Sequence, residues 1–171
     1  MEFLKCALYL AGIGLLSFLI GRILPKSLFN GEQFPFRTCA AEDRLYRALR
    51  VRVWQNKLPD MSRMFPALMP PKSLSGNYRE RLPRMIQETC IAGLVHLLLA
   101  VFGFYCLRIW PGPGGLCLSL LFCIGNIPFI MIQRYNRPRL IRLAKWSAAR
   151  GQSQETEEDT KENEEIRQCE H

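Results

Sequence analysis

The sequence predicts an all-α integral membrane protein with about three transmembrane helices and further amphipathic helices at the cytosolic membrane surface. Of its 171 residues, 49% are hydrophobic, yet the mean hydropathy is −0.02, so apolar and charged residues are segregated along the chain. The apolar residues gather in three blocks, at about 3–21, 90–109 and 115–132. Each block is long enough to cross a hydrocarbon core of about 30 Å.

The first block has two interpretations. Lys5 followed by an apolar run also fits a secretory signal peptide. No Ala-x-Ala-like cleavage site follows this run, because the chain continues as GRILPKSLFNGE. We therefore expect the first block to be an uncleaved membrane span.

The charge around the blocks predicts their orientation. Residues 22–88 hold 13 Lys or Arg against 6 acidic residues, and residues 134–150 hold 6 Lys or Arg and no acid. The link between the second and third blocks, WPGPGG, has only Arg108 beside it. By the positive-inside rule the basic regions are cytosolic, the N-terminus is outside and the C-terminus is inside. Anionic lipid accounts for this basic charge, so we expect no nucleic-acid partner.

The segment after the first span predicts an amphipathic helix lying in the membrane interface. Leu45, Leu49 and Val53 recur every four residues, and arginines fill much of the remainder. Pro59 is expected to end this helix.

The remaining segments complete a single membrane-embedded domain over 1–151. Residues 61–76 predict an irregular loop at the membrane, and a helix is expected to begin at Tyr78 and lead into the second span. The acidic segment 152–171 has no aromatic residue and is predicted to be disordered.

The chain shows no pattern for a metal or cofactor site. Its seven cysteines form no Cys-x-x-Cys pair, and only two histidines are present, so no zinc pattern exists. P-loop, dinucleotide-binding and serine-hydrolase motifs are also absent.

Two polar residues lie at matching depths inside the second and third blocks. His96 is six residues in from Cys90, and Asn126 is six residues in from Ile132, so both are about 9 Å deep. A short link makes the two spans antiparallel neighbours, and the two side chains are expected to face each other. The pair is either a helix–helix hydrogen bond or a general base with a polar partner.

Glu88 is expected just outside the second span, at the level of the basic cluster that follows the third. It either forms an ion pair with Arg134 or Arg137 or has a role of its own in a site. Its separation from His96, about 12 Å along a straight helix, argues against a direct Glu–His dyad.

The cluster QRYNRPR, 133–139, follows the third block directly. Arg and Tyr at the end of a span are ordinary interfacial anchors. The density of hydrogen-bond donors also suits a site for phosphate or carboxylate head groups. Pro138 is expected to bend the chain and hold the cluster over the mouth of a cavity.

Three stretches carry a resemblance to a known family. NIPFIMIQRYNRPRL (126–140) resembles the C-terminal signature of the glycosyl-4,4'-diaponeurosporenoate acyltransferases of staphyloxanthin-type carotenoid biosynthesis. MIQETCIAGLVH (85–96) and VRVWQNKLPD (51–60) are similar to two other segments of that family. The resemblance runs from about Leu24 to Gly151 and carries over these residues: Arg52, Trp54, Lys57, Asp60, Glu88, Thr89, His96, Asn126, Gln133, Arg134, Tyr135, Asn136, Arg137 and Arg139.

The resemblance implies a bacterial cell-membrane enzyme that esterifies a sugar hydroxyl of a membrane glycolipid with a fatty acyl chain, without a cofactor. The implied partners are membrane lipid, a glycosylated lipid acceptor and an acyl donor, which is acyl-CoA, acyl-ACP or phospholipid. We expect His96 to deprotonate the hydroxyl, Asn126 to orient it or bind the oxyanion, and Glu88 to complete the catalytic set. The expected substrate-binding residues are Trp54, Lys57, Gln133, Arg134, Tyr135, Asn136, Arg137 and Arg139.

Two alternatives stay open. One is a non-catalytic membrane protein that binds lipid or organises a complex. The other is a different small membrane transferase, such as a methyltransferase, which would need a nucleotide-type cofactor site.

Overall fold

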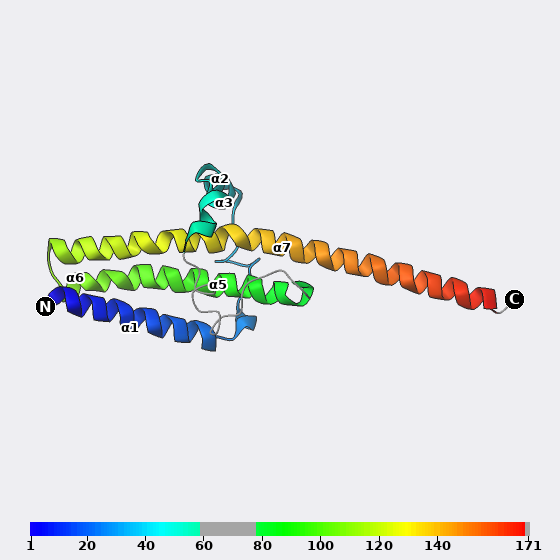
Figure 1. Cartoon of the computed structure of the whole chain (residues 1–171), viewed down its shortest axis with the longest axis horizontal. Helices are drawn as coiled ribbons and strands as arrows, with labels where there is room; N and C mark the ends of the chain where they lie inside the picture. The colour runs from blue at the N-terminus through cyan, green and yellow to red at the C-terminus, as the bar shows by residue number, and fades with distance from the viewer. Residues whose placement is uncertain (59–77, 170–171) are drawn as a thin grey trace.

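Three long helices lie side by side in the computed structural model, which describes residues 1–58 and 78–169 (Figure 1). They are α1, Glu2–Ile23; α5, Tyr78–Phe102; and α7, Pro113–Cys169. Successive long helices run in opposite directions, so the end of α1, the start of α5 and the middle of α7 lie toward the same end of the bundle. Strands are absent from the described residues. The predicted all-α class is therefore confirmed.

Within the described residues, three helices are long and apolar enough to cross a membrane. These stretches are Glu2–Ile23, Glu80–Ile109 and Pro113–Gln152. Each contains one of the three predicted blocks, and the second helix begins at Tyr78 as expected. The chain is therefore associated with a membrane through three apolar helices.

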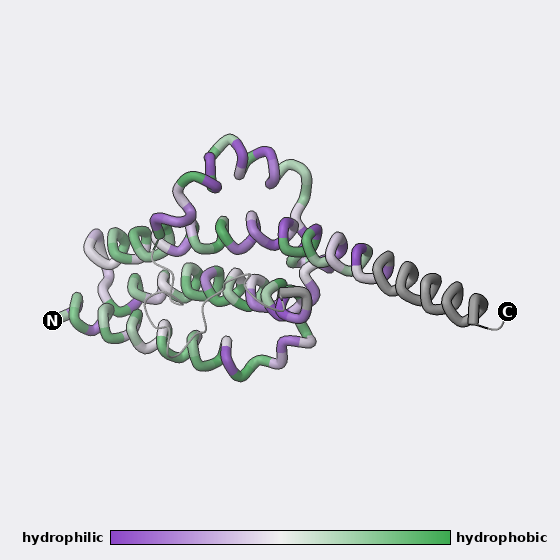
Figure 2. The backbone as a smooth tube through the Cα atoms, turned by 45° about the vertical axis from the view of Figure 1, so that its right-hand side comes forward, coloured by the Kyte–Doolittle hydropathy of each residue, from purple (hydrophilic) through white to green (hydrophobic). Residues whose placement is uncertain are grey.

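The outer surface of the bundle is apolar. On α1, Leu8 is 66% exposed and Ile23 is 81% exposed, and only Cys6 is buried. Hydrophobic colour dominates α1 and the first half of α7, whereas hydrophilic residues gather toward the other end of the bundle (Figure 2). Apolar side chains facing outward over whole helices fit lipid as the surrounding solvent.

Six short helices complete the described chain. They are η1, Lys26–Leu28; α2, Ala40–Ala48; α3, Val51–Trp54; η2, Gln55–Lys57; η3, Gly103–Tyr105; and α6, Cys106–Ile109. The last two continue α5 to the link before α7. In that link Gly112 has φ +112, which lets the chain reverse without the strain that a side chain would add.

The amphipathic helix predicted as one element is broken in two, which corrects that prediction. Arg50, between α2 and α3, has φ 49 and ψ 41, in the left-handed region. Tyr46 and Val51 are five positions apart and would point about 140° apart on a straight helix. The break lets both side chains pack on Tyr135 of α7. Pro59, its predicted end, lies outside the described residues.

Helix α7 continues where the sequence predicts a bend. Pro138 lies inside it, so residues 139–150 continue the same helix and the chain does not leave α7 at this proline. Side chains that pack on both sides of the helix at this level can offset the backbone hydrogen bond that proline removes.

The backbone is also helical through the acidic segment to Cys169, where composition predicts disorder. This segment is rich in Glu and also holds Gln, and both have high helix propensity. A segment with few apolar residues can stay helical when it continues a helix that already packs against the bundle.

Candidate active site

His96 of α5 and Asn126 of α7 face each other, as their matching depths predict. Nδ1 of His96 lies 2.9 Å from Oδ1 of Asn126. Asn126 is 7% exposed and His96 is partly buried. The predicted contact is therefore confirmed, whereas a catalytic role for it stays a prediction.

The hydrogen bonds around Asn126 determine which nitrogen of His96 carries the proton. Nδ2 of Asn126 donates to the carbonyl oxygen of Phe122 at 2.8 Å, which leaves Oδ1 as the acceptor. Nδ1 of His96 must then be the donor in the 2.9 Å contact. In the neutral ring, Nε2 is left with an available lone pair, as a general base requires.

Phe129 holds the imidazole ring in place. The two ring centroids are 4.7 Å apart and the ring planes differ by 11°, so the rings are stacked. Phe129 follows Asn126 by three positions on α7, so one face of that helix supplies both the hydrogen-bond partner and the packing surface. In this geometry Asn126 contacts the ring, whereas its predicted contact with the hydroxyl or oxyanion stays a prediction.

Arg137 is buried and bound by protein groups. It is 1% exposed, and Nε and Nη2 donate to the hydroxyl and the carbonyl oxygen of Thr89 at 3.1 and 2.9 Å. Nη1 donates to the carbonyl oxygen of Phe36 at 2.6 Å, and the guanidinium lies 5.4 Å from the Phe36 ring centroid. This side chain therefore joins α7 to α5 and to the segment before α2.

Arg134 contacts the same segment and the first turn of α2. Its Nη2 and Nε donate to the two carboxylate oxygens of Glu42 at 2.7 and 3.1 Å. The carbonyl oxygens of Pro35 and Arg37 accept further bonds at 3.2 and 3.3 Å. A forked contact of this kind fixes orientation as well as distance.

Tyr135 joins α7 to α2 and α3. It is 4% exposed and clusters with Tyr46 and Val51, while Trp54 packs against this cluster. Burial raises the pKa of the Tyr46 hydroxyl, which therefore stays protonated at neutral pH. The guanidinium of Arg139 lies 3.7 Å from the Tyr135 ring centroid.

Glu88 is paired with other residues than those predicted. Its carboxylate accepts from Lys26 Nζ at 2.6 Å and from Arg84 Nε at 3.3 Å. Thr89, the next residue on α5, binds Arg137, whereas the side chain of Glu88 points toward η1. The predicted alternative, an ion pair of Glu88 with Arg134 or Arg137, is not formed.

The remaining predicted substrate-binding residues have no polar partner in the described part of the chain. Lys57 is exposed at the end of η2, and Gln133 and Asn136 are partly buried on α7. A Cβ built on Gly93 would lie 3.7 Å from the Cβ of Gln133, so Gln133 faces α5. Asp60, carried over from the family motif, lies outside the described residues.

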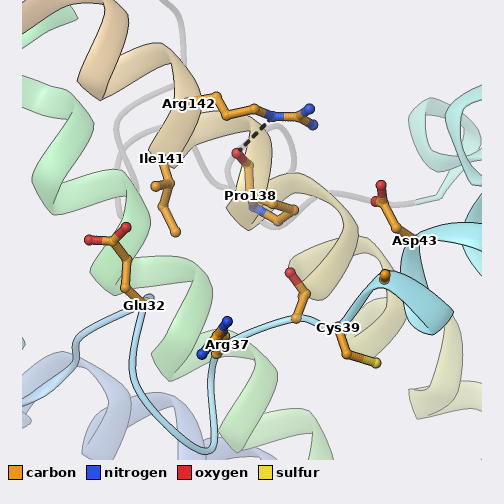
Figure 3. Close-up of a pocket in the computed structure, with 10 residues that line it drawn as sticks. Glu32, Arg37, Cys39, Asp43, Pro138, Ile141 and Arg142 are labelled. Carbon is orange, nitrogen blue, oxygen red and sulfur yellow. Dashed lines mark hydrogen bonds between the residues drawn. The ribbon is translucent and has the colours of Figure 1, made fainter.

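A surface pocket of about 490 Å³ opens next to the basic cluster 133–139, where the segment before α2 meets α7 (Figure 3). It is lined by Gly31, Glu32, Arg37, Thr38, Cys39, Ala40, Asp43, Pro138, Ile141 and Arg142. Apart from Pro138, which was expected at the mouth of a cavity, none of these residues was predicted to belong to a site. Of these residues, Arg142 could have been identified from the sequence, because it lies in the basic, acid-free stretch 134–150 after the third span.

Phe129 and Glu42 were also missed. The spacing of three between Asn126 and Phe129 could have identified Phe129 as a neighbour on the same helix face. Glu42 is 92 positions from Arg134, and no local pattern connects them.

We expect Glu42→Gln to loosen α2 from α7. The substitution removes the charge from the forked contact with Arg134, and a hydrogen bond to a charged group contributes about 1.5–3 kcal/mol. The neighbouring Asp43 forms no ion pair with a described residue, so Asp43→Asn is a matched control. Limited proteolysis of the purified protein should cut Glu42→Gln faster within 30–58 than the control, and equal rates would contradict this role.

Comparison with known proteins agrees with the three motifs. A family model described as glycosyl-4,4'-diaponeurosporenoate acyltransferase matches residues 25–146. Proteins of that name from Staphylococcus aureus strains USA300 and COL are each 27% identical over 154 residues, covering 86% of this chain and 90% of theirs. No solved structure matches the chain. The resemblance is confirmed, and the chain belongs to the glycosyl-4,4'-diaponeurosporenoate acyltransferase family.

Proposed function

We propose that the chain transfers a fatty acyl group to a sugar hydroxyl of a membrane glycolipid, with glycosyl-4,4'-diaponeurosporenoate as acceptor. The observation that carries the proposal is the His96–Asn126 pair, 2.9 Å apart between two apolar helices. The acyl chain and the apolar part of the acceptor both partition into the bilayer, and the pair lies at the depth of such chains. The names of the related proteins supply the acceptor.

In the proposed reaction, Nε2 of His96 accepts the proton of the sugar hydroxyl as its oxygen attacks the acyl carbonyl carbon. The tetrahedral intermediate collapses when the bond to the leaving group breaks. Nε2 then returns the proton to that leaving group, so the imidazole ends neutral. Asn126 is a positioning residue, because its contact with Nδ1 keeps a proton on that nitrogen and so leaves Nε2 free to accept the hydroxyl proton.

The proposal includes an orientation. The basic residues of the segment before α2 and of α7 lie at one end of the bundle, and the link with Gly112 lies at the other. The positive-inside rule then gives a cytosolic basic end, an N-terminus outside and a C-terminus inside.

The reaction is tested with membranes that contain the full chain and membranes that lack it. Both receive glycosyl-4,4'-diaponeurosporenoate together with labelled acyl-CoA, acyl-ACP or phospholipid. We expect lipid mass spectrometry to detect a product heavier by one labelled acyl group only where the chain is present. The unglycosylated carotenoid acid is the matched control acceptor and should give no product. Absence of the product with every donor, from correctly inserted protein, would refute acyl transfer to this acceptor.

A further inference from the structure

Two cysteines from distant parts of the chain meet where α1 packs against α6. Sγ of Cys6 lies 3.8 Å from the carbonyl oxygen of Cys106, 100 positions later in the chain, and the two thiol side chains also interact directly. Both residues are 0% exposed. Figure 1 shows the start of α1 beside α6, at the end of the bundle that carries the link to α7. A buried pair of thiols therefore joins the first span to the second.

The two cysteines lie at matching depths in their spans. Cys6 is three residues in from Phe3, where the first apolar block begins. Cys106 is three residues in from Ile109, where the second block ends. At the helical rise, each is about 4.5 Å below the edge of the hydrocarbon core. The pair therefore lies just inside the bilayer, at the end of the bundle opposite the basic cluster 133–139.

The contacts of Tyr9 hold α1 in the position that brings the two thiols together. Its hydroxyl donates to the carbonyl oxygen of Phe102 at 3.0 Å, and its ring centroid lies 5.2 Å from that of Tyr105. Tyr9 follows Cys6 by three positions, so both side chains lie on one face of α1. Because Cys6 is the one residue of α1 that is buried, a bond at this point would fix a helix that otherwise faces lipid.

The proposed orientation places the pair at the outer side of the membrane. The N-terminus and the link with Gly112 lie at this end, and the basic end faces the cytosol. Disulfides form and persist on the oxidising outer side of a cell, whereas cytosolic thiols stay reduced. Cys39 and Cys90 lie toward the basic end, so the same reasoning keeps those two thiols reduced.

We propose that Cys6 and Cys106 form a disulfide bond that fastens α1 to the second span. The inference rests on the proposed orientation and does not depend on acyl transfer. A disulfide forms without backbone movement where two cysteine side chains point toward each other. The direct contact between these two buried side chains supplies that arrangement.

The oxidation balances with a protein disulfide as the oxidant, on a thiol oxidase that acts at the outer side of the membrane. The thiolate of one cysteine attacks the oxidant's disulfide, and the thiolate of the other then displaces the oxidant from the mixed disulfide. One sulfur–sulfur bond forms and one breaks, and two electrons and two protons pass to the oxidant, which leaves as a dithiol. Because both sulfurs are 0% exposed in the fold, this exchange precedes the packing of α1 on α6.

The bond is tested first by counting thiols in the full chain, expressed in a bacterial membrane. Free thiols are blocked with N-ethylmaleimide during denaturation in SDS, the sample is reduced, and PEG-maleimide then labels the thiols that reduction releases. We expect two adducts for wild type and none for Cys6→Ser or Cys106→Ser. Cys117→Ser is the matched control, since Cys117 is exposed on α7, and it should keep two adducts. No adduct in wild type, or two adducts in Cys6→Ser, would overturn the bond.

A second measurement asks whether the bond joins the two halves of the chain. Cys39→Ser leaves Cys6 as the only cysteine before position 90. After limited proteolysis within 30–58 and thiol blocking, the two fragments should migrate as one band without reductant and as two bands with it. Adding Cys106→Ser should give two bands under both conditions. Separate fragments from Cys39→Ser without reductant would contradict the bond.

Labelling from outside intact cells separates the bond from the orientation. Cys39 is exposed and lies toward the basic end, so a membrane-impermeant maleimide should label it only after the cells are opened. The label on Cys39 is the part that Cys39→Ser loses. Labelling in intact cells would overturn the orientation and the inference together, whereas protection of Cys39 without a disulfide would refute the bond alone. A disulfide in membranes that show no acyl transfer would keep this inference and refute the proposed activity.

Discussion

Replacing His96 by alanine is expected to lower kcat for acyl transfer by about 10²–10⁴-fold, the usual contribution of a positioned general base. The folding cost should be about 1–3 kcal/mol, because the change leaves the buried amide oxygen of Asn126 without its partner and removes one ring contact. Initial rates with saturating donor and acceptor measure the effect. Leu97→Ala is the matched control, since Leu97 is the next residue and is 50% exposed.

The partner residue separates catalysis from packing. Asn126→Leu removes the acceptor that fixes the tautomer of His96, so kcat should fall while the chain remains folded. Asn126→Asp keeps an acceptor and should retain more activity than Asn126→Leu, with a pH profile displaced upward because the carboxylate stabilises the protonated ring. If His96→Ala kept full activity in folded protein, the pair would be a helix–helix hydrogen bond and the proposed mechanism would be wrong.

Replacing Arg137 by methionine is expected to cost about 3–5 kcal/mol of folding free energy, less than the sum of its hydrogen bonds because methionine avoids the cost of burying a charge. The side chain is 1% exposed and donates three hydrogen bonds, and each bond from a charged donor contributes about 1.5–3 kcal/mol. Arg137→Lys should recover little of this loss, because an ammonium cannot reproduce the planar fork that reaches Thr89 and Phe36 together.

Unfolding of Arg137→Met in detergent, followed by circular dichroism, measures this loss. Arg139→Met is the matched control on the same helix. Arg139 is exposed and stacks on Tyr135, a contact worth about 0.5–1 kcal/mol. If Arg137→Met unfolded with the same Tm as Arg139→Met, Arg137 would not hold α5, α7 and the segment before α2 together.

The candidate pair was predictable because a membrane limits the geometry. Hydropathy locates the spans, a short link makes two of them antiparallel neighbours, and a fixed rise per residue converts sequence position into depth. His96 and Asn126 therefore had to lie at one level. The ring contact with Phe129 and the donor role of Nδ1 were not predictable, since they depend on how the two helices are rotated about their axes.

The protein partners of Arg134 and Arg137 were not predictable, because local sequence does not show what covers a helix. Arg134 and Arg137 are three positions apart and share a face of α7, which the spacing indicates. What meets that face is Glu42 and Phe36, about a hundred positions earlier in the chain. A guanidinium that would bind a phosphate when exposed is occupied once a carboxylate and backbone carbonyl groups reach it first.

The sequence by itself determined the membrane class, the three spans, the family and the depth of the His96–Asn126 pair, because hydropathy, helical rise and motif spacing are properties of a local stretch of chain. Tertiary structure alone decided that the chain breaks at Arg50, that Arg134 and Arg137 turn inward, and that Arg37 and Arg142 line a pocket. The physical reason is that charged and polar groups are bound by whichever partners the fold brings within hydrogen-bond distance, and those partners lie far away in the sequence.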